Sequence, residues 1–431
     1  MRTLQELLEK ELRNVPRQIL ERRLAEKFKA AGLRATKART RTLAEYILAG
    51  NTGDIAIAKD RRDASIVVTD EDLDHVLKDT ELFFGEQYEQ IVRDAAGNIA
   101  DLLHKSLTTG WPGEYKAEEA EVAAFRGRLE GRWGEALAKL GMLLTIAREW
   151  TGGAFERRQH AKAVGQKSHL ADVMLRLLVR ACQMTNEILV LLENGFADAA
   201  MARWRTLHEI AIVSAVIAKY GEEIAERYVY YQIVESWSAI KAYERDHKDL
   251  GFRPIPKRLK EKARRDYDKA VKRFGKRFKD ENGWAAHHLK VTEREIVKFT
   301  RLELEAGEQY MRSPYKLASY NVHSSPKGIY VKLGSLNGPE TYLAGRSNAG
   351  LADPGQHAAV SLSQIVQINI GDSLIFDDLV AASIVDRLKF EIPREFGNPR
   401  VHMQRPARGL CDGKRSGGRN GERRAAMDAR G

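Results

Sequence analysis

Three consecutive helical segments between residues 168 and 247 constrain the fold more than any other feature of this sequence. They span residues 168 to 194, 197 to 219 and 222 to 247. Asn194 and Gly195 end the first segment, and Gly221 ends the second, as expected at the C-termini of helices. The predicted fold class is therefore all-α, a multi-helix bundle.

The sequence before this bundle predicts an N-terminal helical module over residues 1–150. Apolar residues at spacings of three and four indicate amphipathic helices in its first 48 residues. Longer helices are expected over 71–109 and 115–150, separated by the stretch TTGWPGEY. Between these parts, residues 55–69 could form a short hairpin around the charged turn KDRRD.

The stretch TGGAFERRQHAKAVGQK, residues 151–167, loses periodicity and marks the boundary to a bundle domain over 168–390. Near the end of that domain, Ser313 and Pro314 are typical of a helix start. The stretch GIYVKLGS predicts a short strand, and one or two final helices are expected within 356–388. Residues 397–431 are rich in Gly, Arg and Pro, and are predicted to be a disordered basic tail.

Composition narrows the functional classes. The chain has 431 residues and only two cysteines, Cys182 and Cys411, so neither a disulfide framework nor a cysteine zinc site is expected, and a cytoplasmic location is favoured. The N-terminus lacks the pattern of a signal peptide, and the apolar run Ile210 to Ala218 is too short to cross a membrane. No membrane association, metal or cofactor is predicted, and neither an HExxH motif nor a His-rich cluster is present. The absence of phosphate-binding loops ending in GK[ST] and of nucleophile elbows disfavours nucleotide hydrolases and serine hydrolases.

The net charge of +11 is concentrated in two places. Residues 252–279 hold thirteen Lys and Arg against three acidic residues, and the last 41 residues hold ten against five. Such a basic helix is often a solvated face, but it is also typical of a nucleic-acid-binding surface. The cations predicted to contact nucleic acid are Lys257, Arg258, Lys260, Arg264, Arg265, Lys272, Arg273, Lys276 and Arg277.

A candidate reactive site lies in the stretch GFADAAMARWRTLHEI, residues 195–210. In a helix Arg205 is a neighbour of Glu209, and Arg205 shares a flank with His208. The simplest interpretation is an intrahelical ion pair beside a histidine satisfied by packing. However, the helix is apolar over much of its circumference, and buried charges need partners and often mark sites.

A second polar stripe is predicted in the stretch RSPYKLASYNVHSSPKG. If residues 314–323 are helical, Tyr315, Ser319 and His323 recur every four residues and end at a loop. The stripe could line a ligand site, or it could be a hydrogen-bonded seam between packed helices.

These residues carry a resemblance. The stretches GFADAAMARWRTLHEIAIVSAVI, AERYVYYQIVESWSAIKAY and YKLASYNVHSSP resemble the bacterial domain-of-unknown-function family 5677 over about residues 170 to 390. The resemblance implies an all-helical bundle and supplies no reaction. The residues that fall on the family's recurrent polar positions are Arg205, Glu209, Glu235, Tyr315, Ser319 and His323.

The chain is more distantly similar to helical HEPN-type ribonucleases, in which a His follows an Arg by four to six residues. Arg203 and His208 have this spacing, but five residues rotate a helix by about 140°, so Arg205 with His208 or His323 is the better pair. Such an enzyme would cleave RNA without a metal, with a His removing the 2′-hydroxyl proton and an Arg stabilising the phosphate.

Two functions therefore stay open from the sequence. The first is a nucleic-acid-acting effector, a metal-independent ribonuclease in defence or stress response, with RNA the expected partner. The alternative is a non-catalytic helical adaptor that binds nucleic acid or a protein through its basic helix. A composite site would favour a homodimer, and the N-terminal module is expected to bind a protein partner of unknown identity.

Overall fold

A computed structural model describes residues 3–53, 66–292, 294–323, 325–335 and 342–404. This part of the chain is helical with no β-strand, which confirms the all-α prediction. The chain divides into two compact units, Met1–Glu118 and Glu119–Gly431. This division lies well before the predicted boundary at 151–167, because residues from Leu129 onward already pack into the core of the second unit.

The first unit consists of short helices around a small apolar core. Its buried side chains include Leu20, Leu24, Ala44 and Val76. Thr69 caps α4 through a capping box with Asp72, so this helix begins where the sequence predicts. The predicted hairpin falls mostly on residues 54–65, outside the described residues. The helices are α1 (Leu4–Leu12), α2 (Val15–Ala30), α3 (Lys37–Leu48), α4 (Asp70–Leu82), a π-helical turn (Phe83–Gln87) and the start of α5 (Tyr88–Ala163).

Helix α5 is continuous over the two places where breaks were predicted. Pro112 lies inside it, so the predicted interruption at TTGWPGEY is wrong. The surrounding residues 108–115 are exposed, and water can therefore hydrate the carbonyl that Pro112 leaves without a donor. At the C-terminal end, Arg158 is buried and binds Asp172 and two backbone carbonyls, which holds 151–163 in helical form.

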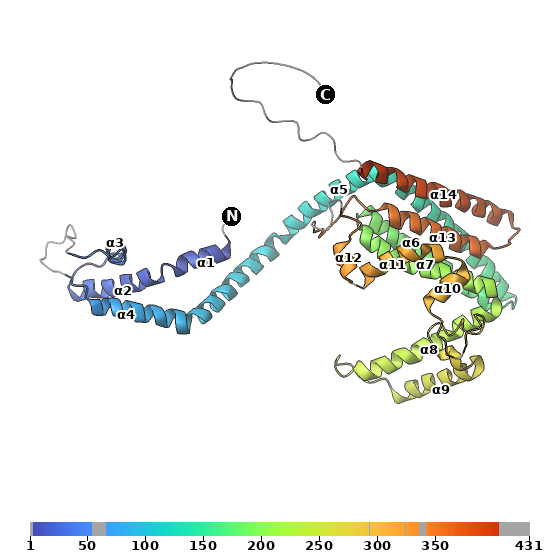
Figure 1. Ribbon diagram of the computed structural model, residues 1–431, viewed down its shortest axis with the longest axis horizontal. Helices are drawn as coiled ribbons and strands as arrows, with labels where there is room; N and C mark the ends of the chain where they lie inside the picture. The colour runs from blue at the N-terminus through green and yellow to red at the C-terminus, as the bar shows by residue number, and fades with distance from the viewer. Residues whose placement is uncertain (1–2, 54–65, 293, 324, 336–341, 405–431) are drawn as a thin grey trace, which may run out of the picture. The chain divides into compact units, whose positions relative to one another are not determined.

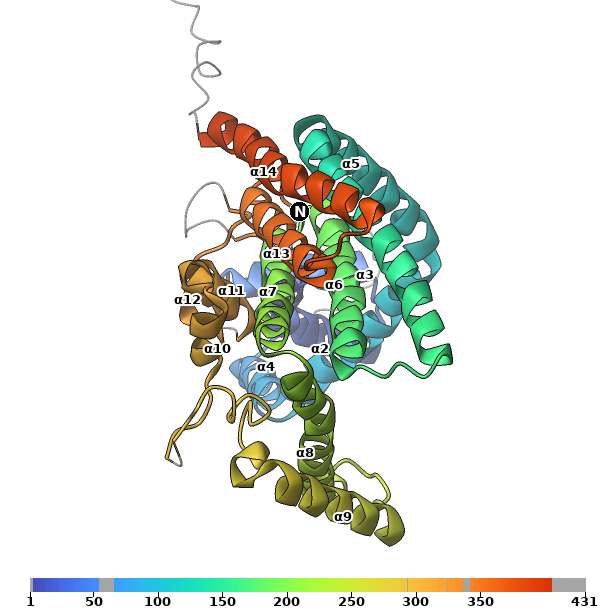
Figure 2. The ribbon, with the colours of Figure 1, turned by 90° about the vertical axis from the view of Figure 1, so that its right-hand side faces the viewer.

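Helix α7 (Ala197–Tyr220) is central to the second unit (Figures 1 and 2). It contacts α6 (His169–Glu193), α8 (Glu222–Asp246), α10 (Phe299–Ala306), α11 (Arg312–Val322) and α13 (Ala352–Ile370). The turn before it needs Gly195, whose φ is 75° and whose added Cβ would lie 2.6 Å from Phe125. The predicted limits of α6, α7 and α8 are confirmed within one residue.

The C-terminal part of the bundle differs from the prediction in three places. Residues 326–330 form a helical turn, α12 (Pro326–Tyr330), so the predicted strand at GIYVKLGS is wrong. Helix α11 begins at Arg312, one residue before Ser313, because a 3-10 turn leads into it. Helix α14 (Phe376–Gln404) continues beyond Gly397, and the remainder of the predicted tail lies outside the described residues.

Helices α8 and α9 (Lys257–Phe274) run side by side and project from the bundle (Figures 1 and 2). A 3-10 turn (Lys276–Lys279) follows α9. The apolar side of α9 packs on α8 through Ala270 and Tyr267. The ring centroid of Tyr267 lies 6.1 Å from that of Trp237 in α8. This packing leaves the opposite side of α9 to solvent.

Candidate functional site

Helix α7 presents Arg205 and Glu209 on one face, as the sequence predicts. Arg205 Nη2 lies 3.2 Å from Glu209 Oε1. Tyr315 of α11 bridges the two, because its hydroxyl accepts a hydrogen bond from Arg205 at 3.0 Å and donates one to Glu209 at 2.7 Å. Burial, followed by the bond to Glu209, raises the pKa of Tyr315 to about 12. The phenol therefore stays protonated at neutral pH and acts as a donor to Glu209.

His208 lies beneath this bridge and is fully buried. Its ring centroid lies 5.3 Å from Trp204, 5.7 Å from Tyr315 and 6.4 Å from Phe299. Neither ring nitrogen has a hydrogen-bond partner among the described residues. Burial and the repulsion of His357 lower the pKa of His208 to about 4. The imidazole is therefore neutral and enclosed, and the surface of a folded RNA cannot reach it in this conformation.

Two residues that the sequence reasoning missed complete the cluster. Glu303 of α10 is buried, and its Oε1 lies 3.8 Å from His208 Nε2. Its Oε2 accepts from Arg312 Nη1 at 2.7 Å. Burial raises the pKa of Glu303, although Arg312 opposes that shift. The polar cluster thus comprises Arg205, His208, Glu209, Glu303, Arg312 and Tyr315, and it fastens α10 and α11 to α7.

The other residues of the predicted site lie elsewhere. Ser319 donates to the carbonyl of Tyr315 within its own helix. His323 is exposed at the C-terminal end of α11, about 12 Å along the helix axis from Tyr315. Glu235 lines a cavity between α8 and α9. Arg203 pairs with Glu187 of α6, so it faces away from His208, as the helical rotation predicts.

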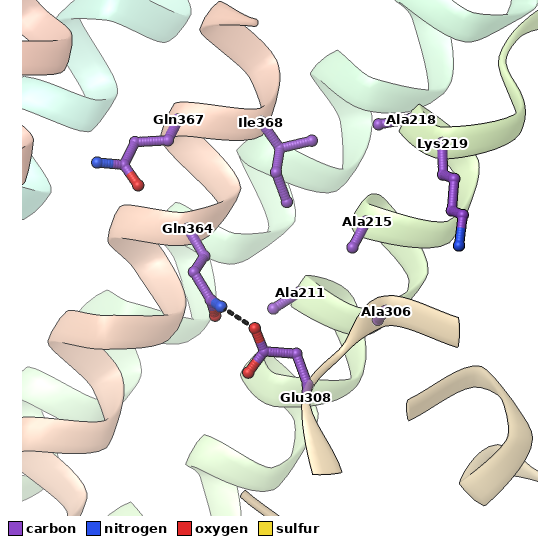
Figure 3. A pocket seen from close by; sticks show the side chains of 9 residues that line it. All are labelled: Ala211, Ala215, Ala218, Lys219, Ala306, Glu308, Gln364, Gln367 and Ile368. Carbon is purple, nitrogen blue, oxygen red and sulfur yellow. Dashed lines mark hydrogen bonds between the residues drawn. The ribbon is translucent and has the colours of Figure 1, made fainter. Parts of the chain in front are cut away.

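A cavity of about 370 Å³ lies one helical turn along α7 from His208 (Figure 3). Ala211, Ala215 and Ala218 form its α7 wall, and Gln364 of α13 lies opposite. Its charged groups already have internal partners, since Lys219 binds Glu305 and Glu308 accepts from Gln364. This leaves a recess with one alanine-lined wall beside the polar cluster.

The basic helix separates into paired and unpaired cations. Five of the nine predicted cations pair with nearby carboxylates: Lys257, Lys260, Arg264, Arg273 and Arg277. The other four predicted cations are exposed and form no ion pair with described residues. Three further lysines of the same segment, which were not among the predicted cations, are also exposed and form no ion pair with described residues. These seven residues, called the cation stripe below, are Arg258, Lys262, Arg265, Lys269, Lys272, Lys276 and Lys279.

The cation stripe follows one side of α9. Within the helix its members are separated by four, three, four and three residues, which places each one beside the next. Lys276 and Lys279 continue the series through the 3-10 turn. From Arg258 to Lys272 the stripe is about 21 Å long, at 1.5 Å per residue. Periodicity could have found Lys262, Lys269 and Lys279, which were missing from the predicted set.

The fold and these clusters define an all-helical bundle protein with a buried polar network and a basic projecting hairpin. Residues 171–340 match a family of unknown function, DUF5677, which confirms the resemblance for that segment. No curated protein and no solved structure matches the chain. In the described part of the chain, no helix combines the length and the apolar composition that a membrane crossing requires.

The buried imidazole of His208 predicts a loss of stability in mild acid. Its pKa in the folded chain, about 4, lies below the usual 6.5, so only the unfolded chain takes up a proton between these values. The contribution of the neutral His208 to the free energy of unfolding is complete above pH 6.5 and decreases as the pH falls toward 4. We expect urea unfolding, followed by circular dichroism, to show about 2 kcal/mol less stability near pH 5 than near pH 7.5.

The variant His208→Leu should remove most of this pH dependence, because leucine fills the site without a titrating group. His323→Ala is the matched control, since it removes an exposed histidine from the neighbouring helix. Equal pH dependence in wild type and His208→Leu would show that another group is responsible.

Proposed function

We propose that this chain binds nucleic acid through the cation stripe of α9. The observation that carries the proposal is that the stripe cations form no ion pair with the described residues. Four other cations of α9, and Arg277 of the turn after it, do have carboxylate partners. Like charges three and four residues apart destabilise an isolated helix. An external polyanion would remove that repulsion.

The dimensions of the stripe suit a phosphate backbone. One strand of a duplex carries a phosphate every 3.4 Å along the axis, so a length of about 21 Å faces about six phosphates. The exposed side of α9 offers cations rather than aromatic rings for base stacking. Contacts of this kind position a protein on the backbone without reading its sequence. The proposed role is therefore that of a helical adaptor that docks on nucleic acid, in the cytoplasm that the cysteine content favours.

Metal-independent RNA cleavage in a defence or stress response is the second candidate. It is favoured by the side chains of Arg205 and Glu209, which are 25% and 36% exposed, and by the exposed His323. Because His323 lies about 12 Å from Tyr315 along α11, this scheme requires the end of α11 to move toward Arg205 when RNA binds. His323, rather than the enclosed His208, then removes the proton of the ribose 2′-hydroxyl. The 2′-oxygen attacks the phosphate, the P–O5′ bond breaks, and the leaving 5′-oxygen takes a proton from water. Arg205 stabilises the charge that develops on the phosphate.

One experiment separates the two candidates. The full chain is incubated with end-labelled RNA and duplex DNA in the presence of a chelator, and both complexes and product lengths are measured. Retained complexes with intact nucleic acid support the adaptor. Cleavage that His323→Ala abolishes, while binding persists, supports the ribonuclease. Failure to form any complex at low salt, with the nucleic acid left intact, would contradict both.

A further inference from the structure

A second cavity, of about 270 Å³, lies where α8 packs on α9 and on the segment after it. Four charged side chains line this cavity: Glu235, Lys241, Lys279 and Glu281. Each is exposed, and none forms a hydrogen bond or ion pair with any residue in the described ranges. In the cavity beside α7, by contrast, the charged groups have internal partners. Two carboxylates and two ammonium groups around one space therefore stay available to a ligand that offers both hydrogen-bond donors and an anionic group.

Aromatic side chains complete the lining. Tyr231, Trp237 and Tyr267 belong to the cavity wall. The hydroxyl of Tyr231 donates to the carbonyl of Asp280 at 2.7 Å, and burial raises its pKa, so that bond persists at neutral pH. The guanidinium of Arg264 lies 5.6 Å from the Trp237 ring. These contacts fix the rings in place, and fixed rings are suited to stacking against a planar ligand.

We propose that this cavity binds a single nucleotide whose base carries an exocyclic amino group, adenine or cytosine. The base lies against the aromatic wall, and the carboxylates of Glu235 and Glu281 accept hydrogen bonds from its amino group. Lys241 and Lys279 bind the phosphate as cations. The volume is close to the lower end of small-molecule sites, which suits one nucleotide.

Uracil distinguishes this arrangement from general anion binding. It presents a carbonyl oxygen where cytosine presents an amino group, so a carboxylate opposite it has no donor. The inference deepens the proposed function and partly rests on it, because Lys279 belongs to both the cavity and the cation stripe. A strand held by the stripe would place an unpaired nucleotide in the cavity.

Equilibrium dialysis with AMP, CMP and UMP tests the proposal on the full chain. Wild type should bind AMP, and should bind CMP about tenfold more tightly than UMP, as expected for one discriminating hydrogen-bond set. The variant Glu235→Ala/Glu281→Ala should lose the preference for CMP over UMP, and Lys241→Ala should weaken the binding of all three nucleotides equally. Equal affinity of wild type for CMP and UMP, or binding of none of the three, would overturn the proposal.

A stripe variant keeps this test independent of the proposed function. Arg265→Glu/Lys269→Glu/Lys272→Glu changes no residue of the cavity lining. It should retain AMP binding while it loses duplex binding. If wild type binds duplex but not AMP, the cavity proposal alone is wrong. If wild type binds AMP but not duplex or RNA, the proposed function of the stripe is wrong.

Discussion

Changing Arg265, Lys269 and Lys272 to glutamate should weaken binding to a short labelled duplex by about 100-fold or more at low salt. Each of these side chains is exposed and unpaired within the described residues, so each is available to a phosphate. The substitutions remove three such contacts and place three repulsive carboxylates in their positions. Fluorescence anisotropy of the duplex measures the change in affinity.

The control carries the same change in total charge on another part of the second unit. Arg128, Arg132 and Arg176 are exposed and form no ion pair with the described residues. Their replacement by glutamate should reduce affinity by no more than a few-fold, through long-range repulsion alone. An equal loss in both variants would show that binding follows net charge and not the stripe.

Arg312→Ala should lower the free energy of unfolding by about 3 kcal/mol. The substitution leaves Glu303 buried without its cation, and breaking one partner of a buried pair costs about 3 to 5 kcal/mol. We expect the lower end, since the side chain of Arg312 is 36% exposed. Chemical denaturation at neutral pH measures the loss. Arg301→Ala, an exposed arginine on α10, is the control and should cost less than about 0.5 kcal/mol.

A second substitution separates the buried charge from simple packing. In Glu303→Gln/Arg312→Ala the carboxylate becomes a neutral amide, so the penalty for an unpaired charge disappears. This double variant should be more stable than Arg312→Ala alone. A double variant that is less stable than either single variant would indicate that packing around Arg312, rather than its charge, holds α11 to α10.

The ends of a helix can be predicted from the sequence where a single residue starts or stops the helix through its own backbone conformation or capping hydrogen bond. Gly195 and Gly221 end α6 and α7 because both have positive φ, and Thr69 begins α4 through its capping box. The helix interruption predicted at Pro112 is wrong for a physical reason. An exposed helix can hydrate the carbonyl that proline leaves free, so local chemistry alone does not decide whether the helix stops.

The candidate site, too, could be predicted only where its residues are near neighbours in one helix. The neighbours Arg205 and Glu209 follow from helical spacing, and the Tyr315 bridge joins them across more than 100 residues. Glu303 could not be distinguished from Glu305 in the stretch RLELEAG, because only the packing of α10 buries the first and leaves the second with Lys219. Likewise, Lys260 and Arg273 pair with carboxylates of α8, which sequence spacing does not reveal. The other three paired cations bind carboxylates three or four residues away, which spacing could have found.

The most direct test of the central proposal is the salt dependence of duplex binding by the unmodified chain. If about six stripe cations contact phosphates, the logarithm of the association constant should fall with the logarithm of salt concentration at a slope of about −5. Affinity would then decrease about 1000-fold between about 50 and 200 mM salt. A slope near zero, or no measurable binding at the lowest salt, would contradict the proposal that the cation stripe binds nucleic acid.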